Sequence, residues 1–231
     1  MATSKFRKVL LVDGYMREHE KVLNLSNIIP NTINVIIFEY QLLIDTWDKK
    51  MSNPAAIISE DGLSFEFGLD KPKFCQGIIG THIVKYGESF EWTLKILEFN
   101  GEKLNIVIGL VPNKESVLKH EGGAAYWNHN GAFIYLPLSG NRAYNKKLKT
   151  GWVDEKLFGK PGDVLQIKFE WNKESLPALY FIPNGKNLGN FFVDTERKTI
   201  EIPNDKQIGY RMGVSVLVAK RVKIEMESVG F

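Results

Sequence analysis

The side chains best suited to catalysis or metal binding are few and widely scattered in this chain. Its histidines follow no ligand spacing, and it has a single cysteine, Cys75. Zinc sites need Cys and His at short spacings, and a cysteine nucleophile needs a base held against it. We therefore expect no metal and no cofactor, and we interpret Cys75 as a small buried hydrophobe. The four histidines are His19, His82, His120 and His129.

Two sequence motifs that mark enzyme active sites do not occur. These are Gly-x-Ser-x-Gly, which exposes a hydrolase serine, and Gly-x-x-x-x-Gly-Lys-Ser/Thr, the phosphate-binding loop. Gly122-Gly123 lacks the rest of the phosphate pattern and is interpreted as loop. Acid–base catalysis needs two carboxylates in one cleft with different environments. Glu60, Asp154 and Glu155 are expected at the surface and Asp61-Gly62 in a turn, so we expect a protein that is not an enzyme.

The charge balance excludes some classes of partner. With 30 basic and 27 acidic residues the net charge is only +3, and Lys146 to Lys149 is interpreted as a solvated loop. Nucleic-acid binding needs basic residues gathered on one face. No apolar run approaches the roughly 20 residues of a membrane span, and Val9 to Val12 is too short for a signal peptide. We expect no nucleic-acid or membrane partner, and a cytoplasmic location.

The first 45 residues differ in pattern from the rest. Tyr15, His19, Val22 and Leu23 follow helical spacing, although Gly14 interrupts the segment. Pro30 suits the first turn of a second helix. That helix has an apolar stripe made by Ile33, Ile36, Ile37, Tyr40, Leu43 and Ile44. We predict a helical extension over residues 1–45, with one or two short helices, followed by a domain over residues 46–231.

From Thr46 onward the sequence predicts short strands separated by turns. Asn100-Gly101 is typical of a hairpin turn, and Asn184-Gly185 is another turn signal. Many short strands with few helical windows indicate an all-β sandwich or barrel. The interval from Val111 to Asn130 is long for a compact domain, and such intervals are usually functional. The expected strands are Ala55–Ser59, Leu63–Phe67, Ile78–Ile79, Ile83–Val84, Phe90–Leu97, Leu104–Val111, Phe133–Leu136, Val164–Trp171, Leu179–Ile182, Phe191–Val193, Thr199–Ile202, Met212–Val218 and Val222–Met226.

Several of these strands resemble those of the SPRY domain, with a short PRY-like lead. The likeness lies in the order of its motifs, since each alone is only moderately specific. Thr93, Gln166 and Pro183 depart from the family pattern and indicate a divergent member; Pro183 also suits an edge strand or bulge. The matching segments are Asn53 to Phe65, Trp92 to Ile96, Asn105 to Leu110, Tyr126 to Tyr135, Gly162 to Val164 and Leu179 to Gly189.

The resemblance implies a bent, antiparallel, concanavalin-like two-sheet β-sandwich without a catalytic centre. It further implies that loops at one end bind a protein or peptide segment. Trp92, Trp127, Trp171 and Phe181 are expected in the core, and Gly62, Gly109, Gly162 and Gly185 at turns or close contacts. The binding face is expected to gather three loops, with contacts from Ser59, Glu60, Asp61, Lys114, Glu115, His120, Tyr126, Val218, Lys220 and Arg221.

Other interpretations stay open at this point. Lys220 and Arg221 could only protect an edge strand from aggregation, and Tyr126 could be core. Ile29 to Tyr40 is faintly similar to the opening helix of an F-box, which would make the chain a substrate-recognition adaptor of a ubiquitin ligase. The chain could also be a structural subunit of a larger assembly, or a small-ligand binder or enzyme with an unrecognised cleft. The sequence indicates neither the partner nor the oligomeric state.

Overall fold

In the computed structural model the chain divides into two compact units, Met1–Leu42 and Leu43–Phe231. The predicted N-terminal helices, Cys75, Trp127 and the predicted strand Thr199–Ile202 lie outside the described residues. None of the described residues forms a helix long and apolar enough to span a membrane. The structure describes residues 44–67, 76–100, 105–114, 131–144, 147–150, 152–153, 157–171, 176–193, 207–218 and 221–230.

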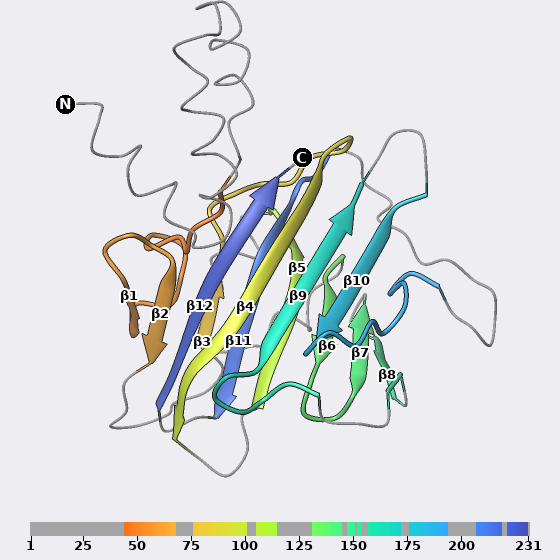
Figure 1. The fold of residues 1–231 in the computed structure, drawn as a ribbon. Coiled ribbons are helices and arrows are strands. Elements are labelled where there is room, and N and C mark those ends of the chain that lie inside the picture. The colour runs from red at the N-terminus through yellow and green to blue at the C-terminus, as the bar shows by residue number, and fades with distance from the viewer. Residues whose placement is uncertain are drawn as a thin grey trace, which may run out of the picture. The chain divides into compact units, whose positions relative to one another are not determined.

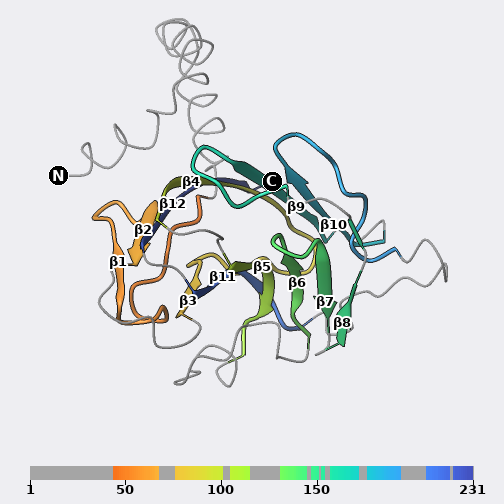
Figure 2. The same cartoon turned by 90° about the horizontal axis from the view of Figure 1, so that it is seen from below.

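The described part of the second unit is an antiparallel sandwich of two six-stranded sheets (Figure 1). In a view at right angles to that of Figure 1, the first sheet curves over the second, and the two sheets form separate layers (Figure 2). The first sheet has the order β1 (Ala56–Ile58), β2 (Ser64–Phe67), β12 (Arg221–Gly230), β4 (Ser89–Asn100), β9 (Val164–Glu170) and β10 (Ala178–Pro183). The second sheet has the order β3 (Gln76–Ile79), β11 (Tyr210–Val218), β5 (Asn105–Pro112), β6 (Phe133–Leu136), β7 (Asn141–Tyr144) and β8 (Lys147–Lys149).

A core forms between the sheets because strands of the first sheet such as β4 and β9 alternate inward apolar and outward polar residues. On β4, Phe90, Trp92 and Leu94 point inward and are almost fully buried. Burying such a side chain contributes roughly 1.5–3 kcal/mol. The predicted all-β two-sheet sandwich is therefore confirmed, as are the core positions of Trp171 and Phe181.

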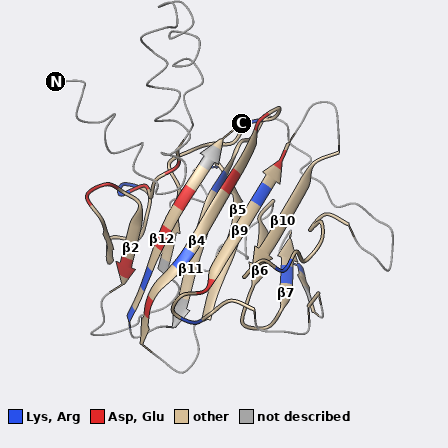
Figure 3. Ribbon diagram, in the orientation of Figure 1, with Lys and Arg blue, Asp and Glu red and all other residues tan. Residues whose placement is uncertain are grey.

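The outer face of the first sheet carries charges that are paired between strands (Figure 3). Lys168 on β9 lies 3.0 Å from Glu91 on β4, and the register places Lys95 on β4 opposite Glu225 on β12. Opposite charges facing each other across strands stabilise a sheet modestly. This face is therefore solvated and largely neutralised by its own pairs.

The outer face of the second sheet is built instead from small and apolar residues. Pairing aligns one such row across all six strands: Leu148, Ala143, Ile134, Gly109, Gly213 and Ile79. Gly109 is required there, because a Cβ at this position would collide with the carbonyl oxygen of Phe133. Close approach of β5 and β6 thus explains a glycine inside a strand.

Three predictions about turns and edges need correction. Asn100-Gly101 does not join a hairpin, since β4 and β5 lie in different sheets. Lys147–Lys149 is not a loop but the edge strand β8, and β7 was not predicted at all. Phe191–Val193 is not a strand. It belongs to the chain segment that runs beside β10, and the amide of Phe191 donates a hydrogen bond to the carbonyl of Leu179.

The turn after β10 agrees with its sequence signal. Asn184 and Gly185 have φ values of 47° and 81°, the left-handed conformation that Asn-Gly favours. After this turn the chain runs back along β10, and Leu188 donates to the carbonyl of Phe181. Pro183 therefore ends an edge strand, as expected, and the edge of β10 is covered by the chain itself.

Candidate functional site

Asp45 is the only fully buried carboxylate among the residues that the structure describes, and hydrogen-bond donors surround it. Its Oδ1 accepts bonds from the amide of Thr46 (2.9 Å), the hydroxyl of Thr81 (3.1 Å) and the amide of His82 (2.7 Å). Its Oδ2 accepts a bond of 2.9 Å from the indole nitrogen of Trp92. Buried charges persist in proteins only when they are paired or hydrogen-bonded in this way.

The backbone around Asp45 is fixed as well. Its amide donates to the Oγ of Ser228 on β12 at 2.6 Å. Gly80 leaves room for the carboxylate, because a Cβ there would collide with Oδ2 of Asp45. Asp45 belongs to the sandwich, although the sequence-based boundary places it in the N-terminal extension.

Burial raises the pKa of Asp45, and the hydrogen bonds from His82, Trp92 and Thr81 act in the opposite direction. A general base needs a lone pair that a substrate can reach. Because Asp45 is not exposed and both of its oxygens accept bonds, its chemistry is that of a structural anchor.

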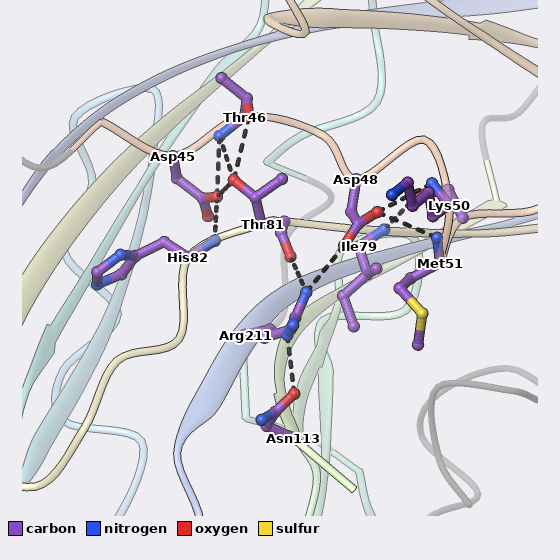
Figure 4. A network of polar contacts seen from close by, with 12 residues as sticks. Asp45, Thr46, Asp48, Lys50, Met51, Ile79, Thr81, His82, Asn113 and Arg211 are labelled. Atoms are coloured by element: carbon purple, nitrogen blue, oxygen red, sulfur yellow. Dashed lines mark hydrogen bonds and ion pairs between the residues drawn. The ribbon is translucent and has the colours of Figure 1, made fainter. Parts of the chain in front are cut away.

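A second carboxylate, Asp48, connects the same segment to the second sheet (Figure 4). Its Oδ1 accepts bonds from the amides of Lys50 (2.9 Å) and Met51 (3.1 Å). Its Oδ2 lies 3.1 Å from NH1 of Arg211 on β11. The turn after Asp48 and the strand β11 are thereby held together by a partly buried, charge-assisted contact.

Arg211 extends this network to the chain that follows β5. Its Nε donates to Oδ1 of Asn113 at 2.9 Å, and its NH1 also donates to the carbonyl of Gly80 at 3.1 Å. The side chain of Arg211 is 13% exposed. A guanidinium group holds three such acceptors in fixed directions because it is planar and rigid.

The β1–β2 turn is anchored nearby. Asp61 accepts bonds from the hydroxyl of Ser59 (2.7 Å) and the amide of Leu63 (3.0 Å). Gly62 has a φ of 76°, and its carbonyl accepts a bond from the amide of Trp47. The turn predicted at Asp61-Gly62 is confirmed, and Glu60 at its tip is exposed.

We use the term network end for the end of the sandwich formed by Ile44–Lys50, Ser59–Leu63, Gly80–Glu88 and Asn113–Lys114. Four of the predicted contact residues lie there: Ser59, Glu60, Asp61 and Lys114. Hydrogen bonds join their segments through Trp47, Asp48 and Arg211. The structure thus brings the β1–β2 turn and the start of the predicted Val111–Tyr126 loop to the same end of the sandwich, and their contact with a partner stays a prediction.

The third predicted loop does not join them. On β11, Tyr210 pairs with Pro112 at the network end, and Val218 pairs with Asn105 at the other end of the same strand. Arg221 pairs with Asn100, so it also lies at the far end. The expectation of a single face made by three loops is wrong in this respect, since consecutive antiparallel strands place their turns at alternate ends.

Arg221 has local partners that explain its position. Its Nε lies 2.7 Å from Glu66 and 3.3 Å from Glu98. The hydrogen bond to Glu66 and the charges of both carboxylates raise the pKa of Arg221. The remaining predicted contacts, Glu115, His120, Tyr126 and Lys220, lie outside the described residues.

Sequence reasoning missed Asp45, Asp48 and Arg211, because each meets its partner across a long stretch of chain. Asp45 and Trp92 are 47 positions apart, and Asp48 and Arg211 are 163 apart. No local motif marks such pairs. Within the described ranges, no group of three or more His, Cys, Asp and Glu side chains could hold a metal ion.

Comparison with known proteins identifies the class of fold. The sequence matches no protein-family model and no curated protein with significance. The SPRY domain of human HERC1 is similar in structure, with a TM-score of 0.54, 14% identity, and coverage of 78% of this chain and 96% of that domain. The chain therefore has a divergent SPRY-like fold, as its motifs indicated.

Two further solved structures show weaker likeness. The TRIM65 PSpry domain has a TM-score of 0.49 at 10% identity, covering 80% of this chain and 89% of that one. The Drosophila melanogaster Neuralized NHR1 domain has a TM-score of 0.49 at 14% identity, covering 79% and 97%.

Proposed function

We propose that this domain is a non-enzymatic module that binds a protein or peptide segment through the network end. The observation that carries the proposal is the network itself. The side chains of Asp45, Asp48 and Arg211 are hydrogen-bonded to the backbone and side chains of neighbouring loops. Loops held rigidly at the end of a sandwich are typical recognition surfaces, because their exposed residues can vary without disturbing the core.

Exposed side chains at the network end supply contact groups. Glu60, Thr81, Lys85 and Lys114 are all exposed, while the loops that carry them are hydrogen-bonded at their bases. Preorganised loops lose little conformational entropy on binding, which favours affinity. The outer face of the first sheet supports binding less well, because its charges already pair with each other.

The SPRY-like fold supports the same role by analogy alone, since fold does not determine function. A ligase-adaptor role would depend on residues 29–40, which lie outside the described part of the chain. The proposal therefore covers the binding of a protein or peptide segment and does not extend to a role as a ligase adaptor.

The proposal is tested with a photo-crosslinking amino acid introduced singly at Glu60, Lys85 or Lys114. Two exposed positions at the other end, Asn100 and Lys160, serve as controls. We expect cross-links to another polypeptide in cell extract from the network-end positions and not from the controls. Cross-links from both ends alike, or from the control end only, would contradict the proposal.

A further inference from the structure

Three exposed lysines lie on the two segments that Arg211 holds together at the network end. Lys49 and Lys50 lie in the turn after Asp48, and Lys114 follows Asn113; all three are exposed. Their ammonium groups make no hydrogen bond or ion pair with any residue that the structure describes. We call Lys49, Lys50, Lys114 and Arg211 the basic corner.

The carboxylate at this corner does not neutralise the lysines. Asp48 uses Oδ1 for the amides of Lys50 and Met51 and Oδ2 for Arg211. The other nearby carboxylate, Asp45, is buried and occupied by its own donors. Among the described residues the basic corner thus keeps an unbalanced positive charge, unlike the first sheet, where Lys168 and Arg221 have acidic partners.

Arg211 also keeps unused donors. Its Nε and NH1 bind Asn113, Asp48 and the carbonyl of Gly80, whereas NH2 has no partner among the described residues. The NH2 atom is also not among the fully buried atoms that lack a partner. A guanidinium fixed on one side with free N–H donors on the other is suited to an anionic oxygen, because the direction of its donors is set in advance.

We propose that the basic corner binds an acidic peptide segment of the partner. A carboxylate or phosphate group of that segment accepts hydrogen bonds from NH2 of Arg211, and Lys49, Lys50 and Lys114 contact flanking acidic residues. This inference depends on the proposed binding function and specifies the charge of the partner. Positive surface charge accelerates encounter with such a segment and disfavours basic ones.

Selection from a random peptide library displayed on phage tests the charge of the partner directly. We expect the full-length protein to enrich peptides rich in Asp and Glu. A synthetic copy of an enriched peptide should bind about tenfold more weakly when its Glu residues become Gln. Versions with phosphoserine in place of Glu separate a carboxylate preference from a phosphate preference. Binding should weaken as salt is raised, since exposed charges are screened.

Two matched double variants locate the site. Lys50→Glu with Lys114→Glu reverses charge at the basic corner, while Lys147→Glu with Lys160→Glu makes the same change in net charge elsewhere on the described surface. We expect the first pair to lose affinity for the acidic peptide at least about tenfold, and the second pair to keep it. Thermal unfolding of both pairs checks that each remains folded.

The outcomes separate this inference from the proposed function. Enriched peptides without acidic residues, whose binding is lost on Glu60→Lys, would overturn the basic corner and leave the proposed function standing. A library that yields no binding peptide would overturn both. Equal binding to single-stranded polythymidine and to the acidic peptide would show a general attraction for polyanions, and would overturn the peptide proposal.

Discussion

The indole nitrogen of Trp92 donates a hydrogen bond of 2.9 Å to the carboxylate of Asp45, which lies 47 positions earlier in the chain. This contact joins the start of the described chain to the centre of the first sheet. Both residues are completely buried. The bond therefore links the stability of the core to the segment that shapes the network end.

Removing this carboxylate should strongly destabilise the fold. Asp45→Ala leaves the donors of Thr46, Thr81, His82 and Trp92 without their acceptor, and the expected loss is about 3–5 kcal/mol in the free energy of unfolding. Urea denaturation followed by tryptophan fluorescence measures it. The control is Glu60→Gln at the exposed tip of the β1–β2 turn, which should change stability by less than about 0.5 kcal/mol. Similar midpoints for both variants would show that Asp45 is not an anchor.

The free energy of unfolding should depend on pH in a way that reflects the raised pKa of Asp45. Burial raises the pKa of this carboxyl above its usual value of 3.8. The folded protein then binds more protons than the unfolded chain between the two pKa values, so Asp45 makes the free energy of unfolding fall as pH rises through that window. The advantage of the wild type over Asp45→Asn should be largest below pH 3.8 and should decrease as pH rises above it. Urea titrations of both proteins over this pH range measure the difference between their free energies of unfolding. A difference that grows with pH would contradict the prediction.

Arg211 should control the order of the chain that follows β5. Arg211→Lys keeps the positive charge but cannot reach Asp48, Gly80 and Asn113 together, so we expect a loss of about 1–2 kcal/mol. Hydrogen exchange should show faster exchange at the amide of Asn113, which donates to the carbonyl of Gly209. Lys168→Arg, on the outer face of the first sheet, is the conservative control. Unchanged exchange at Asn113 would mean that the backbone holds this segment without Arg211.

Gly109 should tolerate no side chain. A Cβ at this position would collide with the carbonyl oxygen of Phe133, so Gly109→Ala must separate β5 from β6, at an expected cost of about 2–4 kcal/mol. Gly162→Ala is the comparison, because a Cβ there meets nothing within 4 Å but must accept a φ of 89°. Its expected cost is only about 1 kcal/mol. Thermal unfolding ranks the two, and the reverse order would be inconsistent with close packing of β5 on β6.

Tyr135 should be replaceable by phenylalanine. Its ring packs against Trp152 and Phe181, and its hydroxyl is buried with no hydrogen-bond partner in the part of the chain that the structure describes. Burial also raises the pKa of Tyr135 to about 12. Tyr135→Phe removes the unpaired group and keeps the ring, so the free energy of unfolding should stay the same or rise by up to about 1 kcal/mol. A loss above about 1 kcal/mol would reveal an unseen partner for the hydroxyl.

The strands could be predicted because their information is local. Alternation along β4 and the Asn184-Gly185 turn each follow from a few adjacent residues, and the structure confirms both. Asn100-Gly101 shows the limit of local information. This dipeptide favours a turn, but it does not decide whether β4 and β5 pair with each other. In the structure β4 pairs with β12 and β5 pairs with β11, so the two strands lie in different sheets.

The network could not be predicted for the same reason. Asp48 and Arg211 are ordinary charged residues in the sequence, and the fold alone brings them within 3.1 Å. The resemblance to the SPRY domain predicts Arg221 as a contact residue in the loop between the last two strands. Its partners Glu66 and Glu98 come from strands that are distant in sequence, so the register of the sheet had to be known before they could be assigned.

The segment from Asp45 to Asn53 also closes the side of the second sheet. Asp48 donates its amide to the carbonyl of Ile79, and Asn53 donates to that of Gly77. A chain cut anywhere within this segment would leave the backbone of β3 open to other molecules, and exposed strand edges promote aggregation. A protease that removed the chain up to Asn53 would therefore yield insoluble material rather than a smaller working domain.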